Sequence, residues 1–167
     1  ALKIFDMTNQ QNKTEMTRRR FIGVSAVATF GFQVVPSRVF GANSRLAVAG
    51  IGAGGKGRSD IVGAAKAGCD IVALCDVDER QAGASYKAHP EAKRFADFRV
   101  MLDKMGGSID ACTISTADHT HAVATSLAMS MGKHCYTQKP LTHDVYEARP
   151  LTRLAKRTNV ATQMGNQ

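Results

Sequence analysis

A glycine-rich turn between two apolar, strand-like runs is the feature that most restricts how this chain can fold. The first run covers residues 46–49, and the turn at 50–55 reads GIGAGG, a match to G-x-G-x-x-G. A helical pattern follows at 56–67, and a second apolar run follows at 70–75. This succession is typical of a βαβ unit with two parallel strands. Residues 46–76 are therefore predicted to open a Rossmann-type sheet.

Each glycine of this turn has an expected task. Gly50 permits the tight turn, Gly52 lets the backbone approach a pyrophosphate, and Gly55 lets the helix pack closely on the strand. Ile51 and Gly54 complete the turn. The N-terminus of the following helix directs free N–H groups and a partial positive charge toward the same point. The pattern thus predicts that this turn binds a dinucleotide.

An aspartate ends the second strand. Asp76 follows Gly50 by 26 residues, where a carboxylate accepts hydrogen bonds from the adenosine ribose and repels a 2′-phosphate. We therefore expect NAD as the cofactor, with NADP as the alternative, because Arg80 lies one turn further on. Under a second interpretation Asp76 only caps the next helix, a position for which Asp78 competes.

The remaining sequence continues to alternate between strand and helix patterns. This alternation predicts an α/β fold, a doubly wound parallel sheet of about six strands, with ligands beyond the carboxyl ends of the strands. Pro150 conflicts with the last helix, where it is expected to cost about 3 kcal/mol or to kink the helix. The expected strands are 46–49, 70–75, 93–95, 109–114, 134–137 and 160–164, and the expected helices are 56–67, 78–89, 97–105, 121–131 and 144–157.

Three further motifs follow the glycine turn in a specific order. They are CDVD at 75–78, TADHTH at 116–121 and QKPL at 138–141. Together they resemble the Gfo/Idh/MocA oxidoreductases, the family of glucose–fructose oxidoreductase and inositol dehydrogenase, over residues 45–167. The resemblance implies an NAD(P)-binding Rossmann domain followed by a second α+β domain of mostly antiparallel sheet. Residues 45–167 do not contain that second domain, so we expect weak dinucleotide binding and no turnover by this piece alone.

The resemblance also assigns roles to residues at the strand ends. Lys139 matches the family lysine near the nicotinamide and the substrate, which takes or gives the hydroxyl proton. Gln138 replaces the usual glutamate and so removes a charge that would hold the lysine. His121 matches a histidine common in the loop under the nicotinamide and is expected to be catalytic. In addition to Lys139, the glycine turn and Asp76, the expected cofactor contacts are Ser115, Thr116, His119 and Gln138.

The N-terminal region resembles an export signal. Residues 16–44 contain the segment TRRRFIG at 17–23 and an apolar stretch at 21–35, and they resemble a twin-arginine leader. This predicts export by the twin-arginine machinery to the periplasm, or membrane anchoring by an uncleaved leader. A basic N-terminal helix and a signal for unfolded export are the alternatives. Residues 1–15 are interpreted as extraneous or disordered.

Charge and cysteine content restrict the remaining classes of function. The chain carries a net charge of +8, and residues 1–44 supply half of it. The rest is spread without a basic run, so we expect no nucleic-acid binding. None of the four cysteines forms a C-x-x-C pair, and all lie in or beside apolar runs. They are expected to be buried free thiols, with no metal site.

The sequence therefore predicts the nucleotide-binding half of an NAD(P)-dependent oxidoreductase that acts on a sugar or polyol. By resemblance, the full-length protein is expected to be a homo-oligomer. An NAD-dependent glycosidase of the same superfamily is one alternative, although such enzymes depart from the Lys-Pro pair found at 139–140. A non-catalytic dinucleotide-binding protein is the other.

Overall fold

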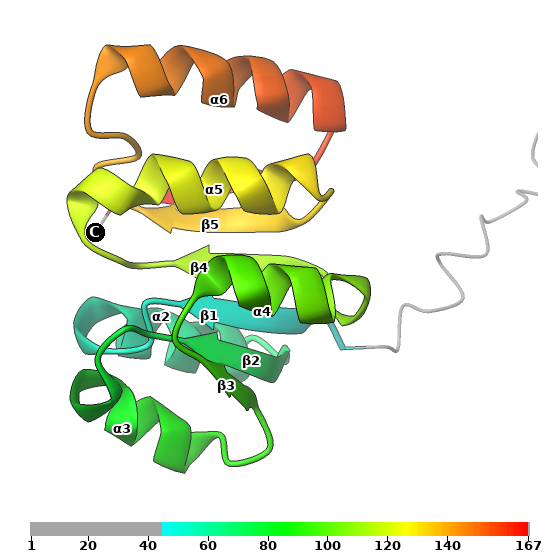
Figure 1. Ribbon diagram of the computed structural model, residues 1–167. Coiled ribbons are helices and arrows are strands. Elements are labelled where there is room, and N and C mark those ends of the chain that lie inside the picture. Colours follow the sequence, from blue (N-terminus) through cyan, green and yellow to red (C-terminus); the bar gives the residue numbers. More distant parts are fainter. Residues whose placement is uncertain (1–44, 167) are drawn as a thin grey trace, which may run out of the picture. The chain divides into compact units, whose positions relative to one another are not determined.

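A computed structural model describes residues 45–166 of the chain. The expectations for residues 1–15 and for the leader at 16–44 lie outside the described residues. The chain from 45 to 166 forms a parallel sheet with helices on both faces (Figure 1).

The sheet has six strands in the order β3-β2-β1-β4-β5-β6, and every neighbouring pair is parallel. This confirms the predicted doubly wound fold. The strands are β1 (Ala47–Ile51), β2 (Asp70–Cys75), β3 (Lys93–Phe95), β4 (Ala111–Ile114), β5 (His134–Gln138) and β6 (Thr162–Gly165). The helices are α2 (Gly55–Lys66), α3 (Glu79–Ala88), α4 (Phe98–Met105), α5 (His121–Ser130) and α6 (Val145–Thr158), with short 3₁₀ turns η2 (Gly106–Ser108) and η3 (Asp118–Thr120).

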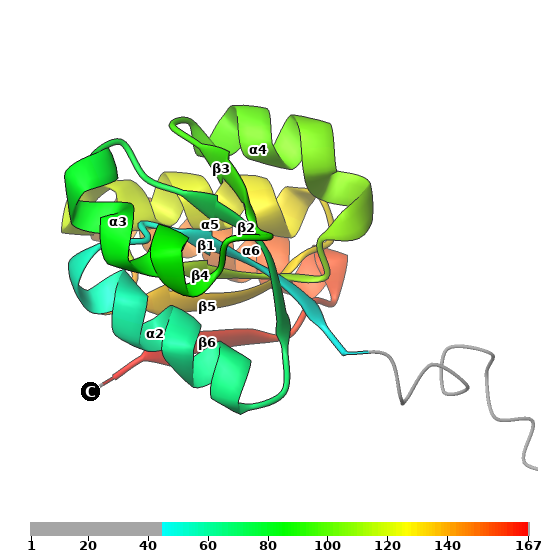
Figure 2. The same cartoon turned by 90° about the horizontal axis from the view of Figure 1, so that it is seen from below.

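The helices form two layers. Helices α2 and α3 cover one face of the sheet, and α4, α5 and α6 cover the other (Figure 2). Right-handed crossovers explain the division, because the sheet grows in one direction from β1 to β3 and in the other from β4 to β6. The direction reverses between β1 and β4, which is the point where ligands bind in sheets of this kind.

Each layer has its own apolar core. Ile51, Leu102, Ile114 and Met129 are among the buried side chains between the sheet and α4–α6. A smaller core beneath α2 and α3 is built from Ala53, Ile61, Leu74, Ala82, Tyr86 and Ala92. Both cores hold the carboxyl ends of β1 and β2 in place, and the glycine turn follows β1 directly.

Aspartate side chains begin three of the helices. Asp78, Asp97 and Asp144 accept hydrogen bonds from backbone N–H groups in the first turns of α3, α4 and α6. The competition between Asp76 and Asp78 for the α3 cap is thereby decided in favour of Asp78. Helix α6 runs from 145 to 158 as one helix with Pro150 inside it, and Pro150 is exposed.

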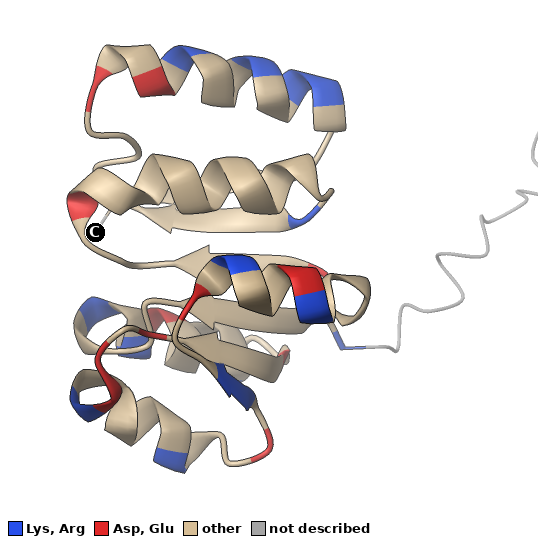
Figure 3. Cartoon of the chain, viewed as in Figure 1, with Lys and Arg blue, Asp and Glu red and all other residues tan. Residues whose placement is uncertain are grey.

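Element bounds differ from the expected ones at a few ends. The fourth strand begins at Ala111 rather than at 109, because the Gly106–Ser108 segment forms a 3₁₀ turn before it. Within residues 45–166, no helix has the length and apolar character that crossing a membrane would require. Lys and Arg side chains lie on several helices of this part of the chain, with Asp and Glu among them (Figure 3).

Candidate dinucleotide site

The glycine turn lies at the carboxyl end of β1, pressed between neighbouring elements. A side chain at Gly50 would begin 2.7 Å from Ile61 Cδ1 of α2, and one at Gly52 would begin 2.5 Å from the carbonyl oxygen of Ser115. Gly52 also has a φ of +82°, a conformation that side chains rarely adopt. Backbone geometry and space therefore require glycine at Gly52. Gly50 lies inside β1 and leaves room for the Ile61 side chain, instead of serving the tight turn that the motif predicts.

The close-packing role expected of Gly55 belongs instead to Gly57. A Cβ at Gly57 would lie 1.7 Å from the carbonyl oxygen of Gly52, whereas one at Gly55 would meet no atom within 4 Å. Gly55 has a φ of +48°, so it serves the turn into α2 rather than the packing. The close contact with the Gly52 carbonyl oxygen therefore lies two residues further along α2 than the motif predicts.

Asp76 holds the turn from the neighbouring strand. Its Oδ2 accepts a hydrogen bond from the N–H of Gly54 at 2.8 Å, and its Oδ1 accepts one from the N–H of Asp78 at 2.9 Å. Each carboxylate oxygen has further lone pairs, so the carboxylate can still accept bonds from ribose hydroxyls. The side chain of Arg80, in contrast, is paired with Asp78.

The N-terminus of α2 fits an anion. Its N-cap residue is Gly54, which provides no side-chain acceptor, and the first turn contains no acidic residue. Lys56 and Arg58 lie in the first turns instead. No side chain caps this helix end, and together with the helix dipole this favours the binding of phosphate oxygens there. Ile51 contributes no side chain here, because it is buried in the core.

The loop after β4 runs beside the glycine turn. The N–H of Ser115 donates to the carbonyl of Ile51 at 2.8 Å. The hydroxyl of Thr116 accepts a hydrogen bond from the hydroxyl of Thr120 at 2.7 Å, and His119 is exposed on η3. The structure thus brings Ser115 next to the turn and leaves His119 facing solvent. The cofactor contacts expected of both residues stay predictions.

His121 lies away from the surface of the crevice. Its side chain is 1% exposed, with Nδ1 2.6 Å from the carbonyl oxygen of Pro140 and Nε2 2.9 Å from that of Thr116. Both ring nitrogens face backbone carbonyl oxygens, which only accept hydrogen bonds, so the bond that forms depends on which nitrogen carries the proton. The buried position gives the expected catalytic role of His121 no support. The ring instead joins the loop after β4 to the loop after β5.

Lys139 lies at the carboxyl end of β5, before a cis peptide bond to Pro140. Its backbone N–H donates to the carbonyl of Gly165 at 3.2 Å, and the residue is exposed. Lys139 thus follows β5 directly, and its place near the nicotinamide and the substrate stays a prediction. Gln138, one residue earlier, is buried and turns its amide toward α2 rather than toward the lysine.

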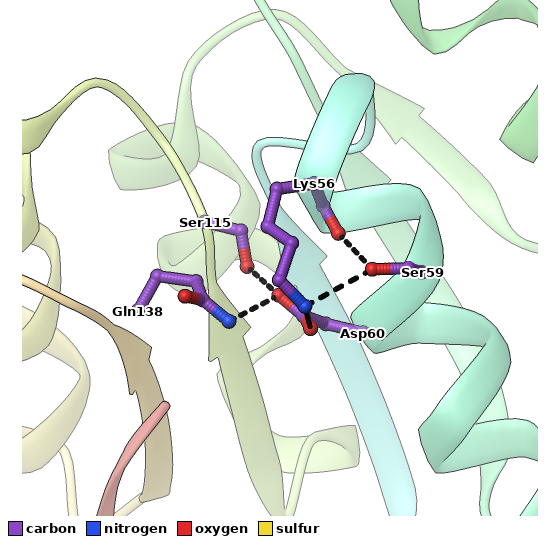
Figure 4. A network of polar contacts seen from close by, with 5 residues as sticks. All are labelled: Lys56, Ser59, Asp60, Ser115 and Gln138. Carbon is purple, nitrogen blue, oxygen red and sulfur yellow. Dashed lines mark hydrogen bonds and ion pairs between the residues drawn. The ribbon is translucent and has the colours of Figure 1, made fainter. Parts of the chain in front are cut away.

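Sequence reasoning missed Asp60, the residue that receives this amide. The Asp60 carboxylate is bonded by Lys56, Ser115 and Gln138 (Figure 4). Lys56 and Asp60 are four residues apart, a spacing that usually marks an exposed ion pair on a helix. The sequence carries no signal that this aspartate faces the strand ends.

The cysteines behave as apolar core residues. Burial raises the pKa of Cys75, Cys112 and Cys135 to about 12, with the carboxylates of Asp76 and Asp97 adding to the effect on Cys75. All four cysteines are free thiols, and Cys69 is half-buried. In the part of the chain that the structure describes, no group of three or more His, Cys, Asp or Glu side chains is placed to hold a metal ion.

Comparison with known proteins shows the family of this chain. Residues 44–166 match the model of the GFO_IDH_MocA family, described as an oxidoreductase family with an NAD-binding Rossmann fold. The chain belongs to this family. The match covers every element described above, so family membership rests on the whole Rossmann domain.

Three relatives illustrate the range within the family. Inositol 2-dehydrogenase of Paracoccus denitrificans is 30% identical over 106 residues, covering 63% of this chain and 31% of that protein. UDP-N-acetylglucosamine 3-dehydrogenase of Acidithiobacillus ferrooxidans is 32% identical over 65 residues, covering 39% and 21%. The crystal structure of myo-inositol 2-dehydrogenase from Lactobacillus plantarum superposes with a TM-score of 0.67 at 26% identity, covering 73% and 36%. The chain thus spans about a third of the length of the first relative.

Proposed function

We propose that this chain is the cofactor-binding part of a dehydrogenase that oxidises a hydroxyl group of a sugar or polyol with NAD. The observation that carries the proposal is the glycine turn, which lies against α2 and Ser115 with Asp76 bonded to Gly54. The names of the relatives, an inositol dehydrogenase and a UDP-amino-sugar dehydrogenase, support a carbohydrate or cyclitol substrate.

The cofactor would be held by three groups of this chain. The turn and the first N–H groups of α2 would bind the pyrophosphate, and Asp76 would accept from the ribose hydroxyls. A 2′-phosphate would meet the Asp76 carboxylate, while the Arg80 side chain is already paired with Asp78. These contacts favour NAD over NADP.

Lys139 would carry the proton of the reaction. When bound, the nicotinamide accepts a hydride from the carbinol carbon of the substrate. The hydroxyl proton must leave as well, and we assign its removal to Lys139, which is exposed directly after the carboxyl end of β5. His121 would act only by fixing the two adjacent loops.

The test uses the gene product that contains this chain, incubated with NAD and a panel of inositols, hexoses and UDP-amino sugars. Formation of NADH with at least one substrate is expected, and Lys139→Ala should abolish turnover while NADH affinity stays within a few-fold. A Lys139→Ala variant that retains the parental rate would contradict the proton-transfer role. Lys104→Ala, which removes an exposed lysine from the last turn of α4, is the matched control and should leave turnover unchanged.

The leader and the assembly state complete the proposal. The TRRRFIG segment at 17–23 and the apolar stretch at 21–35 support export through the twin-arginine pathway, to the periplasm or to a membrane-anchored state. Replacing both Arg18 and Arg19 by Lys should then retain the protein in the cytoplasm. A homo-oligomeric full-length enzyme remains an expectation from the family resemblance, and gel filtration tests it.

A further inference from the structure

A buried carboxylate joins three elements of the crevice. The side chain of Asp60, on α2, is 4% exposed. Its Oδ1 lies 2.7 Å from Lys56 Nζ, and its Oδ2 accepts from Ser115 Oγ at 2.7 Å and from Gln138 Nε2 at 3.0 Å (Figure 4). A buried charge is tolerated when it is paired and hydrogen-bonded, and these three donors satisfy that condition.

Two partners of Asp60 lie at strand ends that the cofactor would contact. Ser115 follows β4 and Gln138 ends β5, one residue before Lys139. We infer that Asp60 is a positioning residue, which sets the Ser115 loop and the β5 end relative to the glycine turn. The inference rests on the proposed function, because it assigns Asp60 a task in cofactor binding.

The same contact explains why residue 138 is an amide. Gln138 lies between Asp60 and Gly165, and a Cβ on Gly165 would come within 2.6 Å of Gln138 Nε2. The amide therefore packs against the β6 backbone on one side and donates to the carboxylate on the other. A glutamate here would place a second carboxylate at hydrogen-bonding distance from Asp60, with Lys56 as the one cation bonded to it among the described contacts.

Asp60 thus selects the chemical type of its partner. The pair needs one carboxylate and one amide, whichever position carries the charge. If the pairing is specific, exchanging the carboxylate and the amide between positions 60 and 138 should preserve it. If the two positions only require polar residues, the exchange should give no recovery.

The experiment compares the 167-residue chain with Gln138→Glu, Asp60→Asn and the double variant, and with Gln163→Glu as control. Gln163 is an exposed glutamine on the adjacent strand β6, and its amide donates to the carbonyl of Met164 rather than to Asp60. Its substitution therefore makes the same chemical change without removing a hydrogen bond to Asp60. NADH affinity is measured by fluorescence titration, and the melting temperature is measured on the same samples.

Gln138→Glu should lower NADH affinity about tenfold and the melting temperature by roughly 5 °C or more. The double variant should recover most of both losses, because a carboxylate–amide pair is restored with its direction reversed. Gln163→Glu should change neither quantity.

Two results would overturn the inference. If the double variant is no better than the sum of its single changes, the two residues are not coupled. If the melting temperature falls while NADH affinity is unchanged, Asp60 only stabilises the fold and does not position the site. Failure of the parent chain to bind NADH would contradict the proposed function itself, and the positioning role with it, while recovery of the melting temperature would still show the pairing.

Discussion

The imidazole of His121 lies against the backbone of Pro140, with its Nδ1 2.6 Å from the Pro140 carbonyl oxygen. The other ring nitrogen lies 2.9 Å from the carbonyl oxygen of Thr116, and the ring is buried. The loops after β4 and β5 are thereby joined through one side chain. His121, which the sequence predicts to be catalytic, thus connects two loops in the structure.

Replacing this connector should therefore reduce stability. His121→Ala leaves a cavity and removes the ring N–H that donates to a backbone carbonyl of Pro140 or Thr116, so we expect the free energy of unfolding to fall by roughly 2–4 kcal/mol. Urea unfolding measures this, with exposed His119→Ala as the control that should change it by less than about 0.5 kcal/mol. A small effect at His121 would contradict the connector role.

Replacement by alanine should have opposite effects on stability at two glycines of α2. Gly57→Ala would place a Cβ 1.7 Å from the Gly52 carbonyl oxygen, so helix α2 must shift and stability should fall by about 3 kcal/mol or more. Gly63→Ala meets no atom within 4 Å, and it should stabilise by about 0.5–1 kcal/mol. Thermal unfolding of both variants tests this, and equal effects would contradict the close contact.

Pro150 should limit the stability of α6. As the sixth helical residue it cannot donate the hydrogen bond that an N–H would give to the carbonyl of Tyr146. Pro150→Ala should raise the free energy of unfolding by about 1–3 kcal/mol, whereas the neighbouring exposed Arg149→Ala should change it little. A destabilised Pro150→Ala variant would mean that the ring makes contacts that outweigh the missing bond.

The buried thiols should make stability depend on alkaline pH. In the unfolded chain a thiol ionises with a pKa near 9, while in the folded chain the pKa of Cys75, Cys112 and Cys135 is about 12. The unfolded state therefore loses protons first, and this contribution to stability is complete below pH 9 and declines as the pH rises toward 12. Urea unfolding between about pH 8 and pH 11 should show a falling free energy, and a constant value would contradict the burial of these thiols.

Much of the fold was predictable because its signals are local. The glycine turn, the alternation of apolar runs and the capping aspartates at Asp97 and Asp144 each lie within a few residues of the structure they specify. The six parallel strands follow from that alternation. Element ends were less predictable, as at the fourth strand, because a 3₁₀ turn at Gly106–Ser108 forms from residues without a helical period.

The places of the motif residues in the fold were predictable, but the contacts of individual side chains were less so. Gly52 and Asp76 lie where the motif places them. The task of Gly57 depends on how α2 approaches a carbonyl, and that of Asp60 depends on strand ends 55 and 78 residues away in the sequence. Such contacts form between residues that are distant in the sequence, so no local sequence pattern predicts them.

Cofactor selection tests the central claim most directly. The 167-residue chain is titrated with NADH and with NADPH under identical conditions, and binding is followed by cofactor fluorescence. The arrangement of Asp76 beside the glycine turn predicts that NADH binds and that NADPH binds more weakly. Equal or tighter binding of NADPH would contradict the role of Asp76, and absence of binding by either cofactor would contradict the site.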